Sequence, residues 1–423
     1  MNNVSAHRAF SFLRTYGYER VSCSKEERNV AEALLNECTS LGVSAQLEEF
    51  TVPCGRVSHA LLRVTSPYVK EYEVTGYERA ASTPEGGLDA EFLYVENADE
   101  VLLEQAKGKI VLVNGYLNRA TYEKLRKAEA AAILTFTGRT IDRENESDLN
   151  RCKLRETLTE PFGAIPVLNM RAASAAEIVR RGAKTVHIEL TGECYDGTSQ
   201  NVCATIPGTD KPSEVITLGG HYDSVYFSSG VHDNLSGSVI VLELLRYFAA
   251  HPPRRTLRFC WFGSEEQGLL GSKAYVKAHA DELKDCVAML NFDVAAPTLG
   301  SNHLVTLATD DALHYVTGVL REAGYGVRAK QDTYSSDCIP FADNGVPAIN
   351  LARFGANGAD YMHNRHDSLK SGYLDEHALD ITLQQGFVLL ERLANAASFP
   401  IKREIAPEIR QKVDEYLFKA KKE

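Results

Sequence analysis

The pattern of apolar and polar residues changes character twice along the chain. Residues 27–41 repeat apolar side chains at helical spacing, and residues 43–52 alternate apolar and polar side chains as a strand does. A helix followed by a strand is typical of the start of an α/β domain. From residue 200 onward, helical and strand-like segments alternate again. We therefore expect one α/β domain built from the two ends of the chain.

The stretch between these two parts has a different texture. Short alternating runs such as HALLRVTSP and AEFLYV are separated by turn-forming residues, and two helical segments, YEKLRKAEAAA and AASAAEIVRRG, lie among them. These features predict a β-rich domain inserted at residues 58–193. Residues 1–57 and 194–400 then form one discontinuous domain, and the charged residues 401–423 are predicted to form a surface helix.

The strands expected after residue 200 are apolar on both faces. They read EVITLGG, TLRFCWFG, CVAMLNFDV and VPAINLA, with helical segments such as GSVIVLELLRYFAAH between them. Strands of this kind usually belong to parallel sheets that helices cover on both sides. The predicted fold is therefore a three-layer α/β/α domain with a mixed, largely parallel sheet, interrupted by the inserted domain.

Composition narrows the function classes. The 423 residues are 44% hydrophobic and 24% charged, an ordinary globular balance. The net charge of −11 argues against nonspecific binding to nucleic acid or anionic lipid, because both require clustered Lys and Arg. No stretch reaches the roughly 18 apolar residues that cross a bilayer, and the N-terminus reads as amphipathic helices. We expect a soluble cytoplasmic protein, either a monomer or a homodimer.

The cysteines suggest no further chemistry. They are odd in number, scattered, and never spaced as C-x-x-C, so neither a disulfide framework nor a thiolate zinc site is indicated. Buried free thiols are the expected state. Their positions are 23, 38, 54, 152, 194, 203, 260, 286 and 338.

Short groups of His, Asp and Glu follow the strand-like runs of the second half. In order, they are His221-Tyr222-Asp223, Asp233-Asn234, Glu265-Glu266, Asp293, and His363 with Asp367 four residues later. The carboxyl ends of parallel strands meet at one edge of a sheet, where open α/β folds place their sites. Imidazole nitrogen and carboxylate oxygen are common zinc ligands. The pattern therefore predicts a metalloenzyme.

The first two groups also have structural alternatives. Residues i and i+2 of an extended chain face the same way, so His221 could bind metal while Asp223 orients its ring. Asp233 precedes an apolar helix and could instead be a simple helix cap. A carboxylate shared between two metals is the functional alternative.

The later groups leave similar choices open. Glu265 and Glu266 could be a solvated acidic turn, or one could bind metal while the other moves a proton. Asp293 ends an apolar strand and therefore needs a partner or a cation. Spacing alone does not decide whether His363 or His366 is the ligand.

Taken together, these motifs resemble a known family. The series HYDS, HDNLSG, SEEQGLLGS, NFDV, SSDCIPFADNGVPAINL and H-x-x-x-D-S occurs in order across residues 200–370. It resembles the di-zinc exopeptidases of peptidase family M28, which include bacterial leucyl aminopeptidases and glutamate carboxypeptidases. The resemblance implies two zinc ions, with cobalt or manganese as possible substitutes.

The resemblance also assigns roles to individual residues. It implies that His221 and Asp293 bind one ion, that Glu266 and His363 bind the other, and that Asp233 bridges both. It selects His363 over His366. Glu265 becomes the general base, and Asp223 becomes the residue that orients His221. The bond between Asp233 and Asn234 is implied to be a cis peptide.

The inserted segment resembles the protease-associated domain found inside many members of this family. The stretches GKIVLVNG, AEAAAILTF and IPVLNM carry that likeness. Such domains are thought to cover or shape the active-site cleft, and they carry no chemistry of their own.

The function implied is that of a zinc metallopeptidase acting on peptides. We expect an aminopeptidase that hydrolyses the N-terminal peptide bond with an activated water. One alternative is a glutamate-carboxypeptidase-like or dipeptidase activity, for which Arg353 is the candidate clamp on a terminal carboxylate. Another is an inactive receptor or binding protein, against which the complete set of ligand positions argues.

Overall fold

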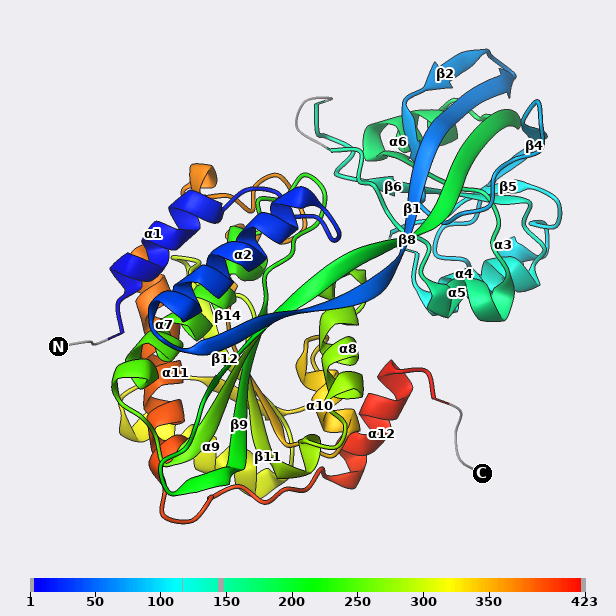
Figure 1. The fold of residues 1–423 in the computed structure, drawn as a ribbon. Coiled ribbons are helices and arrows are strands. Elements are labelled where there is room, and N and C mark those ends of the chain that lie inside the picture. The colour runs from blue at the N-terminus through cyan, green and yellow to red at the C-terminus, as the bar shows by residue number, and fades with distance from the viewer. Residues whose placement is uncertain (1–3, 116, 144–147, 420–423) are drawn as a thin grey trace. The chain divides into compact units, whose positions relative to one another are not determined.

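The computed structural model describes residues 4–115, 117–143 and 148–419, which fold into two compact units. Unit 1 contains Met1–Val52 and Thr198–Glu423, and unit 2 contains Pro53–Gly197 (Figure 1). Two long strands, β1 (Ser44–Ser66) and β8 (Thr185–Ile206), run through the boundaries. The sequence pattern placed the insert at residues 58–193. The boundaries instead fall inside continuous strands, which alternation along the chain cannot reveal.

Unit 1 is built on a mixed sheet in the order β13–β12–β14–β11–β9–β10–β8. The central neighbours β14, β11, β9 and β10 pair in parallel, whereas β12 against β14 and β10 against β8 are antiparallel. The strands are β9 (Lys211–His221), β10 (Arg255–Phe262), β11 (Cys286–Phe292), β12 (Gly300–Leu307), β13 (Arg328–Gln331) and β14 (Ala348–Gly355). This is the largely parallel sheet that the sequence predicts.

Helices cover both faces of this sheet, because its strands carry apolar side chains on both. Along β10, Leu257, Phe259 and Trp261 enter one core, while Cys260 and Phe262 enter the other. The first core lies under α1 (Ala6–Tyr16), α2 (Lys25–Ser40), α7 (Ser236–Ala250), α9 (Asp310–Glu322) and α11 (Glu376–Asn395). The second lies under α8 (Leu270–Ala278), α10 (Cys338–Asp343) and α12 (Pro407–Tyr416).

The first core should be sensitive to lost volume. Phe248 on α7 is fully buried there. We expect Phe248→Ala to lower the free energy of unfolding by about 3–5 kcal/mol, because it removes a whole aromatic ring and leaves a cavity. Denaturant unfolding measures this effect. Leu299→Ala is the control, since Leu299 is 68% exposed and its truncation should change the free energy by less than about 0.5 kcal/mol. Equal effects of the two substitutions would contradict the packing described.

Several elements differ from the sequence-based predictions. The tail is not only a surface helix, because Ile409 and Val413 of α12 are buried in the second core. The 20-residue helix α11 is not among the predicted elements. The predicted helix at residues 122–132 ends at Lys127, and Ala132 already starts a strand. The Ala-rich run has a high helix propensity, but Glu129 takes a left-handed φ of 56° that ends the helix.

Unit 2 is also an α/β structure rather than a mainly β one. Strands β4, β5, β6 and β7 pair in parallel, and β8 and β3 close the sheet in antiparallel fashion. The short strands are β2 (Lys70–Tyr72), β3 (Val74–Gly76), β4 (Leu88–Tyr94), β5 (Ile110–Leu112), β6 (Ala132–Thr137) and β7 (Val167–Arg171). The helices are α3 (Glu100–Leu103), α4 (Arg119–Lys127), α5 (Glu156–Phe162) and α6 (Ala172–Arg180).

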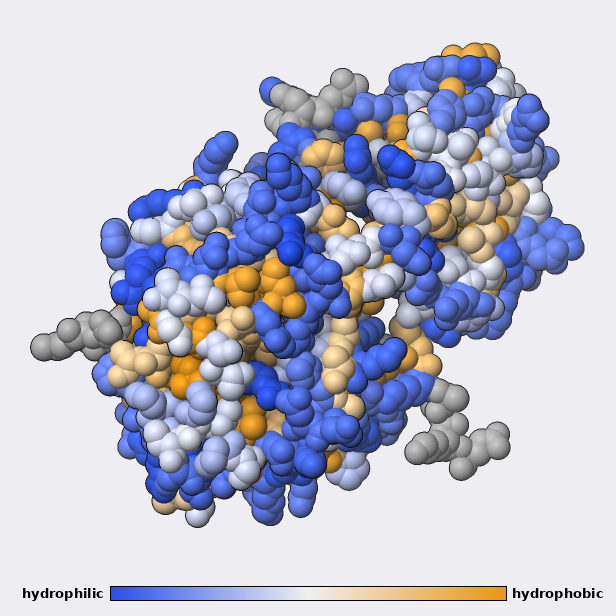
Figure 2. Space-filling view, in the orientation of Figure 1, coloured by the Kyte–Doolittle hydropathy of each residue, from blue (hydrophilic) through white to orange (hydrophobic). Residues whose placement is uncertain are grey.

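The surface carries few large apolar side chains. The face shown in Figure 2 is mostly hydrophilic, with apolar residues in small groups. Among the described residues, no helix has the length and apolar character needed to cross a bilayer. All nine cysteines are free thiols, and six of them are buried.

Candidate metal centre

The predicted site residues lie at one edge of the unit 1 sheet, where its parallel strands end. His221 is the last residue of β9, and Asp293 directly follows β11. Glu265 and Glu266 form the short helix η2 (Glu265–Gln267) just beyond β10. Asp233 lies in η1 (Val231–Leu235), which leads into α7. The sheet therefore gathers residues from distant parts of the chain, as parallel topology allows.

His221 faces two of the predicted ligands. Its Nε2 atom lies 3.1 Å from Oδ1 of Asp233 and 3.6 Å from Oδ1 of Asp293. The three side chains are buried, so water cannot solvate the carboxylate charges fully. Together they form one group of potential metal ligands.

His363 faces the other two. Its Nε2 atom lies 2.9 Å from Oδ2 of Asp233 and 3.2 Å from Oε2 of Glu266. These three side chains form a second group of potential ligands. Asp233 thus belongs to both groups, with one carboxylate oxygen directed toward each histidine.

The spacing of these atoms fits the chemistry of zinc. Nitrogen and oxygen ligands lie about 2.0–2.2 Å from zinc at tetrahedral angles, which places neighbouring ligand atoms about 3.3 Å apart. The separations of 2.9 to 3.6 Å around His221 and His363 fit that value. Two imidazoles and three carboxylates are also an ordinary donor set for zinc.

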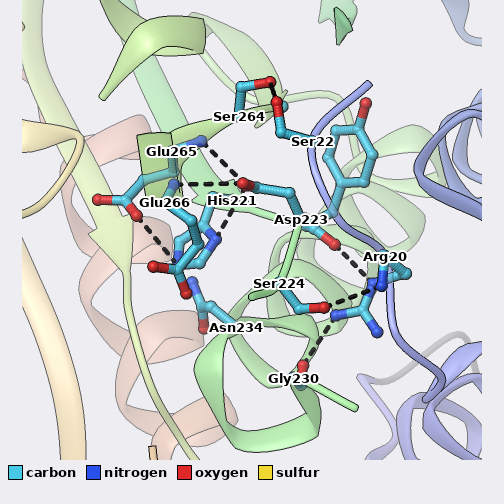
Figure 3. Close-up of polar contacts among 12 residues, drawn as sticks. Arg20, Ser22, His221, Asp223, Ser224, Gly230, Asn234, Ser264, Glu265 and Glu266 are labelled. Atoms are coloured by element: carbon cyan, nitrogen blue, oxygen red, sulfur yellow. Dashed lines mark hydrogen bonds and ion pairs between the residues drawn. The ribbon is translucent and has the colours of Figure 1, made fainter. Parts of the chain in front are cut away.

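Asp223 holds two parts of the centre together. Its carboxylate accepts hydrogen bonds from the main-chain N–H groups of Glu265 and Glu266, at 3.0 and 3.2 Å (Figure 3). Oδ1 of Asp223 also lies 3.3 Å from Nδ1 of His221. The residue therefore orients both the His221 ring and the η2 turn. Glu265 places Oε2 3.8 Å from Nε2 of His221, the longest of the three contacts made by that atom.

Asp367 plays the same part for the Asp233 segment. Its carboxylate accepts hydrogen bonds from the main-chain N–H groups of His232 and Asp233, at 2.7 and 3.0 Å. The side chain is fully buried. The next peptide bond, between Asp233 and Asn234, is cis, as the resemblance implies.

Asn234 ties this segment to the end of β11. Its Oδ1 accepts from the N–H groups of Gly237 and Val294, each at 3.0 Å, and its Nδ2 donates to the carbonyl of Phe292 at 2.8 Å. The side chain is fully buried. Asp233 and Asp293 are therefore held at a fixed separation by their direct neighbours in the chain.

Removing that amide should destabilise the protein. We expect Asn234→Ala to lower the free energy of unfolding of the metal-free protein by about 3 kcal/mol or more, because it leaves three buried main-chain groups unpaired. Urea unfolding measures the effect. Asn36→Ala, at an exposed position of α2, is the control and should change little. A loss below about 1 kcal/mol would show that the amide does not hold the segment.

The centre has more negative than positive charge. Burial raises the pKa of the Glu265, Glu266 and Asp293 carboxyls, and repulsion from neighbouring carboxylates adds to the rise. Burial works against the charged form of His221, yet Glu265, Asp223 and Asp233 hold its pKa well above the ordinary value. Raised pKa values of both the carboxyls and the imidazole indicate a site with an excess of negative charge. Divalent cations would supply the missing positive charge.

The main chain of the centre takes unusual conformations. Ser264, Val294 and His363 have φ values of 54°, 65° and 60°. L-amino acids other than Gly, Asn and Asp rarely adopt this left-handed region, and a β-branched residue such as Val does so least of all. His363 is a predicted ligand, Val294 directly follows the predicted ligand Asp293, and Ser264 directly precedes Glu265. Strain of this kind persists at functional sites, where surrounding contacts fix the chain.

Other candidates named from the sequence lie outside the cluster. His366 is exposed and belongs to none of the ligand groups found among the described residues. Arg353 donates to the carbonyls of Pro297 and Thr298 and to the side chain of Asn302. Those bonds give no support to the prediction that Arg353 clamps a substrate carboxylate.

Some residues of the centre are not predicted from the sequence. Arg20 and Glu27 come from the N-terminal segment and contact the loops that carry the site. Asp337 is a buried acid beside the centre, and burial raises its pKa to about 7. The sequence signal for Asp337 is its place in SSDCIPF, whereas Arg20 and Glu27 lie in a segment with no motif.

Comparisons with known proteins match the part of the chain that carries the predicted metal ligands. Residues 201–384 match the model described as Peptidase family M28. The chain is 28% identical over 342 residues to Aminopeptidase YwaD of Bacillus subtilis, which covers 78% of this chain and 71% of the relative. It is 27% identical over 291 residues to Carboxypeptidase Q of Mus musculus, and the alignment covers 66% of this chain and 62% of the mouse protein. More than a third of the mouse protein thus lies outside the alignment.

A solved structure extends the likeness to the whole fold. The zinc aminopeptidase BSAP from Bacillus subtilis superposes with a TM-score of 0.78 at 21% sequence identity, covering 96% of this chain and all of the other. This match confirms the predicted α/β fold class. Residues 201–384 thus match the model of peptidase family M28, which confirms the resemblance that their motifs indicated.

Proposed function

We propose that the protein is a metal-dependent aminopeptidase whose five ligand residues hold two zinc ions. His221 and Asp293 would bind one ion, Glu266 and His363 the other, and Asp233 both. The observation that carries this proposal is the position of Asp233, whose two oxygens lie 3.1 Å from Nε2 of His221 and 2.9 Å from Nε2 of His363. A helix cap would not need a carboxylate placed between two imidazoles.

Bound zinc lowers the pKa of a water molecule and polarises a carbonyl oxygen, so that water can attack a peptide bond near neutral pH. The chain itself supplies the fixed framework. Asp223 orients the His221 ring through Nδ1, and Asp367 and Asn234 fix the Asp233 segment. Rigid support of this kind keeps ligand atoms in place without reorganisation during the reaction.

Glu265 is the candidate general base. Its neighbour Glu266 is paired with His363, whereas the closest His221 contact of Glu265 is 3.8 Å long. The Glu265 carboxylate can therefore accept a proton from the attacking water and return it to the leaving amine. Its main-chain N–H is fixed by Asp223, which keeps the carboxylate near the reacting atoms.

The end of the peptide that is cleaved follows from charge. A free α-amino group is cationic, and the carboxylates of the centre exceed its imidazoles in number. Such surroundings favour an ammonium group over a carboxylate. A carboxypeptidase would need cationic groups facing the site, and Arg353 is committed to the loop at residues 297–302. The relatives named aminopeptidases support the same choice.

The test uses one peptide in two blocked forms. A leucine-containing pentapeptide is prepared with an acetylated N-terminus or with an amidated C-terminus, and mass spectrometry identifies the trimmed end. We expect stepwise N-terminal trimming of the amidated form and no cleavage of the acetylated form. Cleavage of only the acetylated form would assign a carboxypeptidase, and cleavage of neither would favour the receptor alternative.

Residues 58–193 remain assigned to a protease-associated domain on the motifs that carry the resemblance. We propose that this domain shapes the choice of peptide. Deleting residues 58–193 should then change the relative rates for peptides of different length and sequence. Unchanged relative rates in a folded deletion variant would refute that role.

A further inference from the structure

The N-terminal segment that follows α1 supplies a buried cation to the loop between two ligand positions. Arg20 is fully buried. Its Nε atom donates to the carbonyl of Tyr222 at 2.6 Å, and its Nη1 atom donates to the carbonyl of Ser229 at 2.7 Å. Its Nη2 atom donates to the carbonyl of Gly230 at 2.8 Å (Figure 3). The guanidinium therefore joins the start and the end of the loop that separates His221 from Asp233.

The main chain around Arg20 reinforces this attachment. The N–H of Arg20 donates to Oγ of Ser224 at 2.9 Å, and the N–H of Ser224 donates to the carbonyl of Arg20 at 3.0 Å. Gly230 has a φ of 52°, and a Cβ there would lie 2.5 Å from Cβ of Ser224 and 3.0 Å from Nη2 of Arg20. The loop thus closes tightly against the arginine.

The same segment reaches the turn that carries Glu265 and Glu266. Oε1 of Glu27 accepts from the N–H of Ser264 at 3.1 Å and from the hydroxyl of Ser199 at 2.8 Å. The Ser22 hydroxyl also bonds the Ser264 hydroxyl. Ser264 is the left-handed residue directly before Glu265. Glu27 is fully buried, so these bonds hold the strained turn in a dry environment.

The charge of Arg20 is not used in an ion pair. Among the described residues, no carboxylate lies within ion-pair distance of its guanidinium, and carbonyl oxygens take its hydrogen bonds. The guanidinium of Arg20 interacts electrostatically, over a longer distance, with the carboxylates of Asp367, Asp223 and Asp233. A buried charge without a close counter-ion is costly, and apolar residues usually stabilise a core better. Stability alone therefore does not account for Arg20.

We infer that Arg20 and Glu27 are positioning residues, which we call the N-terminal clasp, and that they set the zinc affinity of the centre. Arg20 fixes the His221–Asp233 loop and places a permanent positive charge beside the acids that hold the ligand segments. Glu27 fixes the Ser264 turn and, through it, Glu265 and Glu266. This inference rests on the proposed zinc centre and adds to it a control from outside the ligand loops.

The test compares zinc affinities of two clasp variants and one matched control. Arg20→Lys keeps the charge but cannot reach both ends of the loop. In the unsubstituted protein, the Cys23 N–H donates to Oε2 of Glu27 at 2.7 Å. Glu27→Gln keeps an acceptor for Ser264 but presents an N–H₂ group to that Cys23 N–H. The control is Arg255→Lys. Arg255 is equally buried in unit 1 and donates to the carbonyls of Leu393 and Ala396 and to Glu214, away from the ligand loops.

The measured quantity is the zinc dissociation constant of each full-length protein, obtained by competition with a chromophoric chelator well below the unfolding temperature. Residues that orient metal ligands typically change affinity by about 10- to 100-fold. We expect weakening of that size in both clasp variants and less than about twofold in Arg255→Lys. Thermal unfolding of the metal-free proteins is recorded in parallel, because a purely structural role would lower that midpoint alone.

The outcomes separate the clasp from the proposed function. If the unsubstituted protein binds no zinc, the zinc centre itself is wrong. If it binds zinc and either folded clasp variant binds it as tightly, the clasp is wrong. Equal weakening in Arg255→Lys, or failure of both clasp variants to fold while Arg255→Lys folds, would also overturn the clasp, since it would then be an element of general stability.

Discussion

Glu265→Gln should lower kcat by roughly 10²–10⁴-fold, the usual contribution of a positioned general base. The amide has nearly the same shape as the carboxylate but cannot accept the proton of the attacking water. Glu265 makes the longest of the three contacts to Nε2 of His221, so its replacement should leave the five proposed ligand residues in place. Zinc content should therefore stay unchanged.

Steady-state hydrolysis of leucine p-nitroanilide and metal analysis of the same sample check this prediction. Glu408→Gln, at an exposed position of α12, is the control and should keep full activity. Loss of zinc together with activity would make Glu265 a ligand instead of a base. Activity within threefold of the unsubstituted enzyme would assign the proton transfer to another group.

Asp233→Ala should abolish the binding of both ions, because this one carboxylate contacts the histidine of each ligand group. Zinc that binds only the folded state stabilises it by about 2.7 kcal/mol per site at 100 times the dissociation constant. The unsubstituted protein should therefore unfold at a clearly lower temperature in chelator than in zinc. The variant should unfold at the same temperature in both and should have no measurable peptidase activity.

Differential scanning calorimetry with zinc or chelator makes this comparison. Asp281→Ala, at an exposed position after α8, should respond to zinc as the unsubstituted protein does. A variant that still gains stability from zinc would show that the two ligand groups bind independently of Asp233.

Much of the centre can be predicted from the sequence because its residues mark the ends of apolar strands. His221 and Asp293 are predicted in this way, since β9 and β11 are apolar runs that stop at a polar residue. Local pattern alone leaves a choice at His363, whose position depends on a long loop after β14 and a left-handed φ of 60°. The resemblance of the ordered motifs to the M28 family selects His363 over His366.

Other parts depend on contacts that no local pattern encodes. Arg20 meets the Tyr222 carbonyl across a sequence separation of 202 residues, and Glu27 meets Ser264 across 237. The strands β1 and β8 continue through both unit boundaries, so the insert begins and ends without a break in structure. Helix α12 contributes only two buried side chains, Ile409 and Val413, too few for its charged sequence to predict a packed face.

The central claim is best tested by measuring zinc per chain and substrate choice on one preparation. We predict two zinc ions per chain, hydrolysis of leucine p-nitroanilide but not of its N-acetylated form, loss of that activity in chelator, and its return when zinc is added. Full activity in chelator, or hydrolysis of only the acetylated substrate, would contradict the assignment of a zinc aminopeptidase. One zinc ion per chain in the fully active enzyme would contradict the proposal that Asp233 binds two ions.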